Sequence, residues 1–454
     1  MNRKLKSILF FISAISSLAY ASPTVLEVKY MPITVDGHTA KYATIQQPNG
    51  TWGYISQEGQ QYNVIVKNEL NVPTVIHWHG LILPNKEDGV LLTQNNKAIQ
   101  PGQQMHYQFK LKQSGTYWMH FHYKLQEQMG VEAPLIIENP HDKYNDQQVV
   151  IMFQDFSFTK PEKILADLKK DSSNDKPMSM PMKPDLNDVN YDAYLTNYHQ
   201  DSHPEIRYVK KGSDVRLRFI NGASASNFWI NLGKLDGKLI AVDGHDIHAI
   251  NGSKFQLGIS QRADIIIHIP KSGGTFPILG QVEGLKNQTG VILTTNPLLT
   301  SATIPNKAKK ASPALNYDQS YQLHSLTMPQ TAAQKVHFKV VLTGDMQNYQ
   351  WKLNGKSWPN TTPLTVKQGK QVDIQFVNKS NMSHPMHLHG YAFNIVKING
   401  KPINGATRDV ILVQPHSTVT IQFVANHPGK WLLHCHMLYH LAAGMETYLN
   451  VIPS

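Results

Sequence analysis

Short runs of alternating or continuously apolar residues, separated by Gly, Pro and Asn, make up most of the chain. Examples are YNVIVKN (62–68), DVRLRFIN (214–221), DIIIHI (264–269) and QVDIQFVN (371–378). Such runs, rich in β-branched residues and bounded by turn formers, are typical of β-strands. Helical periodicity is nearly confined to KPEKILADLKK (160–170). The pattern therefore predicts an all-β fold built of β-sandwiches, with short segments of other structure between the strands.

A strand that ends in asparagine, followed by a polar turn and a second strand, occurs three times. Nine residues after the asparagine, the first and third copies have histidine, whereas the second has isoleucine. The residues are Asn68 with His77, Asn221 with Ile230, and Asn378 with His387. Recurrence at fixed offsets indicates repeats of one structural unit.

A second element repeats downstream of each of these. A glycine is followed five residues later by histidine in copies one and three and by leucine in copy two: Gly115 with His120, Gly274 with Leu279, and Gly429 with His434. We therefore predict three domains, of which the middle one has no metal ligands. The expected boundaries are 22–142 and 143–300 for the first two, a polar linker at 301–334, and 335–454 for the third.

The N-terminus has the three parts of a secretory signal peptide. A positively charged start is followed by an apolar run over 7–18 and an Ala-Tyr-Ala cleavage site at 19–21. The apolar run is too short for a membrane span, and no later stretch is long enough. We expect residues 1–21 to be removed and the protein to be exported, without stable membrane insertion.

The length and charge limit the possible classes further. A chain of 454 residues is too long for one ordinary core, which agrees with several domains. The formal net charge is +11, but the basic residues are scattered, with only short runs such as 307–310. We interpret this excess as favouring solubility and expect no nucleic-acid partner.

Cys435 is the only cysteine, so an exported chain of this sequence has no internal disulfide. Three interpretations remain: a buried free thiol, an intermolecular bridge, or a metal-bound thiolate. Its neighbours favour the last, because it lies in HCHMLYHLAAGM (434–445).

Four H-x-H triplets occur at equivalent places in copies one and three. With 22 histidines in the chain, about one such spacing is expected by chance. Residues i and i+2 of a strand share a face, so each triplet presents two imidazoles on one side. Two pairs from each of two domains can converge on a site of eight imidazoles, which suit copper, zinc and iron. The eight are His77, His79, His120, His122, His387, His389, His434 and His436.

Cys435 points away from the face that His434 and His436 share. We predict a mononuclear site on the far side, formed by Cys435, His384, His440 and Met445. Two imidazoles, one thiolate and a long thioether contact match a blue-copper electron-transfer site.

These segments resemble the four copper motifs of the multicopper oxidases. They are HWHG (77–80), GTYWMHFH (115–122), HPMHLHG (384–390) and HCHMLYHLAAGM, and the likeness covers essentially the whole mature chain. The residues of the last two motifs, together with LQEQMGV (125–131), look most like those of the bacterial periplasmic copper-resistance oxidases. The resemblance implies three cupredoxin-like Greek-key domains, a periplasmic location and a function in copper tolerance.

The resemblance also implies four copper ions and their ligands. A type 1 copper would be held by His384, Cys435, His440 and Met445, and a type 2 copper by His77 and His387. The type 3 pair would be held by the remaining six, His79, His120, His122, His389, His434 and His436. Single electrons from a small reductant would pass through Cys435 to the cluster, where dioxygen becomes water.

Protons must also reach that cluster. Asp88 matches the family's acidic residue near type 2 copper and is our candidate proton relay, although a turn aspartate before Gly89 explains the dipeptide equally. Tyr439 stands where many relatives carry a glutamate, which leaves the second proton route open.

The reductant is less well indicated. Met382, two residues before His384, offers a soft thioether for Cu(I), as does the cluster Met178, Met180 and Met182, which an ordinary loop would also explain. Asp345 and Glu446 are possible carboxylates for Fe(II) or Mn(II). We expect oxidation of Cu(I), other low-valent metal ions or phenols. The alternatives are a broad laccase-type phenol oxidase, a copper nitrite reductase, and a non-catalytic exported copper-binding or scaffold protein.

Overall fold

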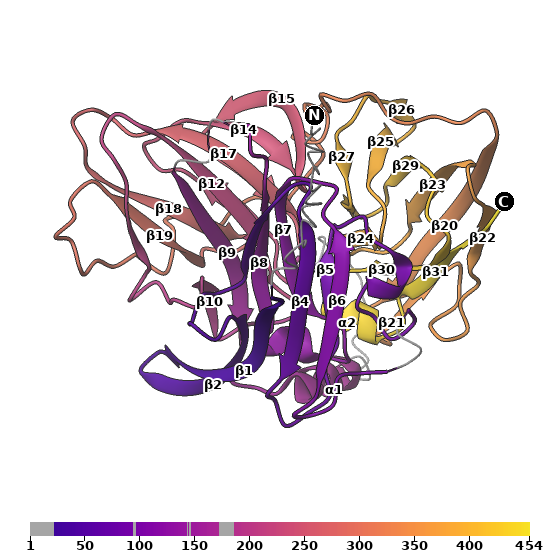
Figure 1. Cartoon of the computed structure of the whole chain (residues 1–454), viewed down its shortest axis with the longest axis horizontal. Helices are drawn as coiled ribbons and strands as arrows, with labels where there is room; N and C mark the ends of the chain where they lie inside the picture. Colours follow the sequence, from indigo (N-terminus) through magenta and orange to yellow (C-terminus); the bar gives the residue numbers. More distant parts are fainter. Residues whose placement is uncertain (1–21, 94–96, 143, 145–146, 172–185) are drawn as a thin grey trace, which may run out of the picture.

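The computed structural model describes residues 22–93, 97–142, 144, 147–171 and 186–454. Within these residues the strands form six sheets, which pack in pairs as three sandwiches. Figure 1 shows the first sandwich, in indigo and purple, between the second on its left and the third on its right. The all-β prediction is therefore confirmed.

The first sandwich contains eight strands and two 3-10 turns. Its elements are β1 (Thr24–Val35), β2 (His38–Gln46), β3 (Tyr54–Gln57), β4 (Gln61–Asn68), β5 (Ile76–His79), η1 (Asn85–Glu87), β6 (Gln104–Lys110), β7 (Gly115–Phe121), η2 (Gln126–Met129) and β8 (Glu132–Glu138). One sheet has the order β2-β1-β4-β6 and the other β3-β8-β7-β5.

The second sandwich is larger and carries the longer of the two α-helices. Its elements are β9 (Gln148–Phe156), α1 (Pro161–Asp171), β10 (Ala193–Thr196), β11 (Ile206–Tyr208), β12 (Asp214–Asn221), β13 (Phe228–Asn231), β14 (Gly237–Val242), β15 (His245–Gly252), β16 (Lys254–Leu257), β17 (Arg262–His268), β18 (Thr275–Val282) and β19 (Gln288–Thr294). The sheet orders are β10-β9-β12-β17-β14-β15 and β11-β19-β18-β13-β16.

The third sandwich ends the chain. Its elements are β20 (Lys335–Asp345), β21 (Gln350–Leu353), β22 (Leu364–Lys367), β23 (Gln371–Asn378), β24 (His384–Leu388), β25 (Phe393–Ile398), β26 (Lys401–Pro402), β27 (Thr407–Arg408), β28 (Val410–Val413), β29 (Thr418–Val424), β30 (Gly429–Cys435), α2 (Leu438–Ala442) and β31 (Glu446–Ile452). One sheet has the order β21-β20-β23-β29-β25-β26, with β27 beside β25, and the other β22-β31-β30-β24-β28.

The repeated asparagine has the same role in each sandwich. Its side-chain oxygen accepts the main-chain N–H two residues later, and its amide donates to one carbonyl of the same turn and to one of a more distant segment. An asparagine side chain that mimics a backbone turn in this way stabilises the turn. The residues are Asn68, Asn221 and Asn378, at the ends of β4, β12 and β23.

The strands that carry histidine in the first and third sandwiches have histidine-free counterparts in the second. His77 lies in β5 and His387 in β24, whereas Ile230 lies in β13. Each strand pairs with the one that carries the second repeated element: β5 with β7, β13 with β18, and β24 with β30. The repeat seen in the sequence is therefore a repeat in the sheets.

The segment 301–334 packs against the neighbouring sandwiches at several points. Leu315 and Leu323 are buried, and the Tyr317 hydroxyl lies 2.7 Å from Ser417 Oγ in the third sandwich. Trp229 of the second sandwich donates a hydrogen bond to the Pro313 carbonyl at 2.9 Å. The predicted linker thus contacts both domains that it joins.

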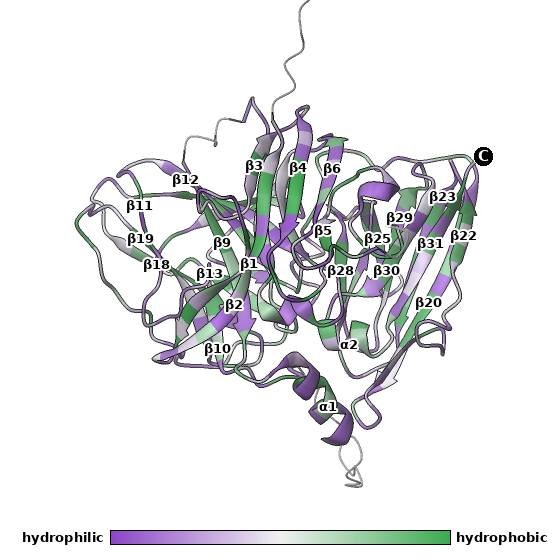
Figure 2. Ribbon diagram, turned by 60° about the horizontal axis from the view of Figure 1, so that its bottom comes forward, coloured by the Kyte–Doolittle hydropathy of each residue, from purple (hydrophilic) through white to green (hydrophobic). Residues whose placement is uncertain are grey.

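The predicted helix is α1, which lies outside the sheets with a largely hydrophilic surface in Figure 2. Among the described residues, no helix is long and apolar enough to cross a membrane. The predicted signal peptide at 1–21 and the methionines Met178, Met180 and Met182 lie outside the described residues.

Candidate metal centre

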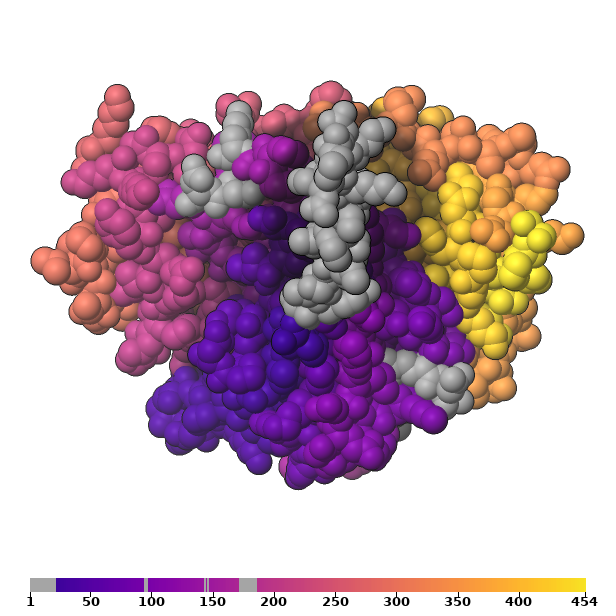
Figure 3. Space-filling view, in the orientation of Figure 1, coloured from indigo at the N-terminus to yellow at the C-terminus, as the bar shows by residue number. Residues whose placement is uncertain are grey.

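Eight histidines from the four H-x-H triplets meet between the first and third sandwiches. Paired strands bring them there: His77 lies opposite His120 in the β5–β7 register, and His387 opposite His434 in the β24–β30 register. Directly opposite residues of an antiparallel pair point to the same face. In the space-filling view the two sandwiches adjoin along one side of the molecule (Figure 3). All eight imidazoles are buried except His122, which is half-buried.

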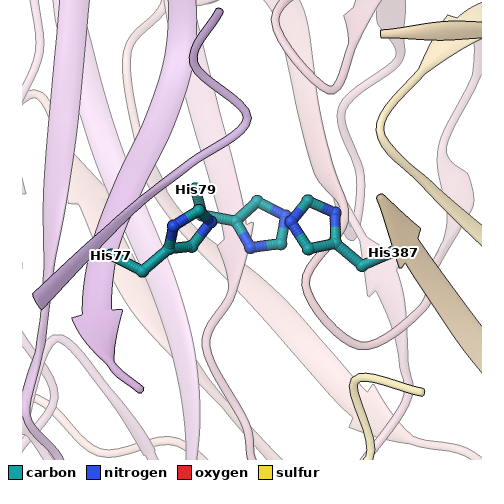
Figure 4. A group of neighbouring side chains, drawn as sticks. All are labelled: His77, His79 and His387. Carbon is teal, nitrogen blue, oxygen red and sulfur yellow. The ribbon is translucent and has the colours of Figure 1, made fainter. Parts of the chain in front are cut away.

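The ligand atoms of these histidines fall into three groups, each within 4.8 Å. One group contains His77, His79 and His387, which Figure 4 shows converging from the two sandwiches. The other two groups are His79 with His120 and His436, and His122 with His389 and His434. In three of the four triplets, therefore, the two imidazoles belong to different groups.

In most of these imidazoles, one ring nitrogen is held by a hydrogen bond to another part of the protein. His77 Nδ1 donates to the Asp88 carbonyl and His387 Nδ1 to the Asp409 carbonyl, each at 2.8 Å. In both rings the opposite nitrogen, Nε2, is buried without a hydrogen-bond partner. In His79 the two nitrogens exchange these roles: Nε2 donates a hydrogen bond to Asp409 Oδ1 at 3.1 Å, and Nδ1 has no hydrogen-bond partner.

Other rings present bare nitrogens to each other. His389 Nδ1 donates to Asp88 Oδ2 and His434 Nδ1 to its neighbour's carbonyl, which leaves both Nε2 atoms unprotonated. These two Nε2 atoms lie 3.0 Å apart. His120 Nε2 and His436 Nε2 face each other at 3.3 Å. The lone pairs of His389 and His434 repel at their separation unless a cation lies between them, so the geometry suits a bound metal ion.

Burial keeps these rings neutral. It lowers the pKa of His79, His120 and His389 well below the usual value, and the neighbouring imidazoles act in the same direction. The pKa of His434 is lowered to about 4, again chiefly by burial. Neutral imidazole is the form that binds metal ions.

Two aspartates join the sandwiches by the same arrangement. Asp88 holds His77 of its own sandwich through its carbonyl and His389 of the other through its carboxylate. Asp409 holds His387 through its carbonyl and His79 through its carboxylate. Asp88 Oδ1 has no hydrogen-bond partner, whereas Asp409 is paired with Arg262. Burial outweighs that pairing and raises the pKa of Asp409 to about 6.

The Asp88-Gly89 dipeptide also has a structural role. Gly89 has a φ of +73°, and a Cβ there would lie 1.7 Å from the Ile76 carbonyl oxygen. The turn therefore packs directly on β5, and Asp88 is fully buried against the histidines. Asp88 therefore forms this turn and also contacts His389.

A third carboxyl group, Glu127 of η2, lies beside the cluster. Its two oxygens are 3.6 Å from His120 Nδ1 and His436 Nδ1. Burial raises its pKa well above the usual value, with further contributions from Glu132 and Asp155. Tyr439, by contrast, donates a hydrogen bond to Gln128 Oε1 at 3.2 Å.

The predicted mononuclear site lies on the other side of the HCH segment. Cys435 Sγ is 3.7 Å from Nδ1 of both His384 and His440, and these two nitrogens are 3.1 Å apart. Burial raises the pKa of the Cys435 thiol, so a thiolate here requires a neighbouring cation.

The outer nitrogens of this site also have protein partners. His384 Nε2 lies 2.7 Å from Ser380 Oγ, and His440 Nε2 lies 2.9 Å from Asp188 Oδ2. Tyr349 donates a hydrogen bond to the same Asp188 oxygen at 2.7 Å. These contacts orient both imidazoles with Nδ1 toward the sulfur, as outer partners of metal ligands do.

The remaining predicted residues differ in accessibility. Met445 is buried, and its carbonyl accepts a hydrogen bond from the Cys435 N–H at 3.0 Å. Met382 is only 2% exposed and packs in the core, so it presents no thioether to incoming Cu(I). Asp345 is exposed, and Glu446 is half-buried with its pKa raised to about 7 by burial.

The donor sets fit copper. Two imidazoles and a thiolate suit a mononuclear copper site, and the three groups of neutral imidazoles suit three further ions.

The sequence did not predict a role for Asp188, Asp409 or Glu127, although the LQEQMGV segment contains the last of these.

Comparison with known proteins agrees with this geometry. Three family profiles, each described as multicopper oxidase, match residues 27–142, 147–302 and 330–454. The chain is 31% identical to the multicopper oxidase MmcO of Mycobacterium tuberculosis, over 87% of this chain and 80% of the relative. It is 26% identical to copper resistance protein A of Escherichia coli, over 87% of each.

Solved structures share the fold. Fet3p, a multicopper oxidase that functions in iron import, superposes with a TM-score of 0.78 at 19% identity, covering 94% of this chain and 90% of Fet3p. The laccase from Botrytis aclada gives a TM-score of 0.76 at 24% identity, covering 94% of this chain and 88% of the laccase. The three sandwiches are therefore cupredoxin-like.

Proposed function

The chain belongs to the multicopper oxidase family and is a copper-dependent oxidoreductase that uses four coppers, and we propose that it oxidises Cu(I) with dioxygen as the acceptor. In this proposal the reductant gives up electrons beside Cys435, and dioxygen is reduced to water among the eight histidines. The boundaries at 142, 300 and 334 are part of the same proposal.

The proposed ligands follow the groups of nitrogen and sulfur atoms. His384, Cys435, His440 and Met445 hold type 1 copper, and His77 and His387 hold type 2 copper. The type 3 pair takes His79, His120 and His436 for one ion, and His122, His389 and His434 for the other. The buried unpartnered nitrogens and the facing bare nitrogens support this division.

One observation carries the proposal: Cys435 joins the two sites through a single peptide. Its sulfur lies 3.7 Å from His384 and His440 on one side, while the adjacent His434 and His436 reach the cluster on the other. Bound copper supplies the one-electron chemistry at the first site and the four-electron chemistry at the second. The chain supplies the short covalent connection between them.

Two carboxyl groups are placed to handle protons. Asp88 Oδ2 accepts from His389 Nδ1 at 3.0 Å and has its second oxygen free of hydrogen bonds. Glu127 faces the opposite side of the cluster, between His120 and His436. We propose that Asp88 passes protons to the type 2 side and that Glu127 serves the type 3 side, where Tyr439 lacks a carboxyl group.

The Asp188 carboxylate is buried beside the mononuclear site, where it touches the outer nitrogen of His440. Its negative charge next to a copper ligand favours a cationic reductant over an uncharged one. A relative named for copper resistance makes Cu(I) the preferred reductant. An exported, periplasmic oxidase of this kind would convert Cu(I) to Cu(II) in copper tolerance.

Oxygen-uptake kinetics on Cu(I), Fe(II), Mn(II) and a phenol, run in parallel with the copper-loaded protein, test this proposal. The proposal predicts the highest kcat/KM for Cu(I). A highest value for the phenol would instead indicate a laccase-type oxidase, and an absence of uptake with every reductant would indicate a copper-binding scaffold.

A further inference from the structure

The middle sandwich contributes no histidine to the cluster, but one of its side chains contacts all three sandwiches. Arg262, at the start of β17, is fully buried. Its Nε donates to the Thr116 carbonyl of the first sandwich at 3.1 Å, and its Nη1 to the Ser260 carbonyl of its own at 3.0 Å. Both Nη atoms bind the Asp409 carboxylate of the third.

The carboxylate that Arg262 holds is the one that holds His79. Asp409 Oδ1 accepts from Arg262 Nη1 at 2.8 Å and from His79 Nε2 at 3.1 Å. A proton fixed on Nε2 leaves Nδ1 as the free nitrogen of this ring. His79 belongs to two of the three groups of possible metal ligands, so its orientation affects both.

The first sandwich leaves room for this pair. Gly80 follows His79, with a φ of +89°. A Cβ at this position would lie 2.5 Å from Arg262 Nη2 and 2.6 Å from Asp409 Oδ2. The glycine that ends the HWHG motif therefore allows the guanidinium and the carboxylate to lie against the backbone beside the cluster.

We propose that Arg262 is a positioning residue of the copper cluster, through which the middle sandwich fixes Asp409 and so holds His79 with Nδ1 toward the metal ions. This inference rests on the proposed copper cluster and deepens it. A planar guanidinium can bind both carboxylate oxygens and two carbonyls at once, whereas an ammonium group cannot reproduce that fork. Outer partners of ligating histidines typically change metal affinity or activity about ten- to a hundredfold.

A neighbouring ion pair provides a matched control. Arg408 of the third sandwich donates to Asp243 of the second, with Nε 2.8 Å from Oδ2. This pair is also buried and also joins the second and third sandwiches. Asp243 accepts the main-chain N–H of Arg262 at 2.8 Å, but among the described residues the hydrogen bonds of the Arg408 side chain go to Asp243 and not to a cluster histidine. A purely structural role for buried arginine–aspartate pairs would make the two arginines equivalent.

The test compares copper-loaded Arg262→Gln and Arg408→Gln with the parent protein. The readouts are copper per chain, blue absorption of the type 1 site, near-ultraviolet absorption of the coupled type 3 pair, and the Tm of the copper-free chain. We expect both variants to have a lower Tm. Only Arg262→Gln should lose at least one copper and the near-ultraviolet band while it keeps the blue absorption.

If Arg262→Gln retains four coppers and the parent's near-ultraviolet band, or if Arg408→Gln loses the same copper, the inference is wrong. Arg262→Lys, which keeps the charge but not the fork, answers the same question if Arg262→Gln does not fold, and it should also lose the band. A parent protein without four coppers would contradict the proposed function itself, before the variants are compared.

Discussion

Asp88 of the first sandwich accepts a hydrogen bond from His389 of the third, with 3.0 Å between Oδ2 and Nδ1. The two residues are 301 positions apart, and both are fully buried. The free second oxygen of Asp88 distinguishes it from Asp409, whose oxygens are both held by Arg262. This difference is the reason that we propose Asp88, and not Asp409, as the proton relay.

Replacement of Asp88 by Asn should slow oxygen reduction specifically. The amide keeps the size and an acceptor oxygen for His389 but neither carries charge nor passes on a proton. We expect oxygen uptake to fall roughly a hundredfold or more, while anaerobic bleaching of the blue site by reductant keeps its rate. Asp214→Asn, which removes the same charge at an exposed position of the second sandwich, is the control. Unchanged uptake in Asp88→Asn would exclude the relay.

Glu127→Gln should have a similar effect on the other side of the cluster. The carboxyl group lies 3.6 Å from both His120 Nδ1 and His436 Nδ1, and the glutamine preserves its shape. We expect oxygen uptake to fall about tenfold or more, with four coppers retained. Tyr439→Phe removes only the hydrogen bond to Gln128, so its uptake should stay near the parent value. The reverse order of the two variants would assign the proton role to Tyr439.

Asp188→Asn should change how the protein discriminates among reductants. The substitution removes the negative charge beside His440 and weakens the contact that orients its ring. We expect kcat/KM for Cu(I) or Fe(II) to fall about tenfold, and kcat/KM for an uncharged phenol to fall less. Asp373→Asn serves as the control, since this carboxylate of the third sandwich accepts hydrogen bonds from Gln371 and Gln422 and is not one of the candidate metal carboxylates. An equal loss for every reductant would show that Asp188 only orients His440.

The parts of the site that the sequence predicted are those encoded by local spacing. An H-x-H triplet at a strand end places two imidazoles on one face, and the recurring asparagines identify which strands are equivalent. The sequence alone therefore predicts His77 and His387 in equivalent strands, and the structure has them in β5 and β24. The same spacing placed Cys435 on the opposite side of its strand from His434.

The parts that the sequence did not predict depend on contacts between distant segments. Asp188 approaches His440 from a different sandwich, 252 residues earlier in the chain, and no local pattern marks it. Asp409 lies between β27 and β28, next to the charged Arg408, and Arg262 begins β17, which also contains Asp264. Charge in the sequence therefore marks neither residue, and only their burial makes them informative. Met382 was expected to be accessible because it precedes His384, but the turn folds its side chain into the core.

The connection through Cys435 is the central claim, and oxygen uptake by the parent and by Cys435→Ser, with copper content measured in the same samples, tests it most directly. Serine preserves the shape but provides a poor copper ligand. We predict that Cys435→Ser loses the blue absorption, retains the cluster copper and consumes oxygen at the background rate with excess reductant. A variant that keeps the parent's colour and turnover would contradict the claim that electrons cross at this residue.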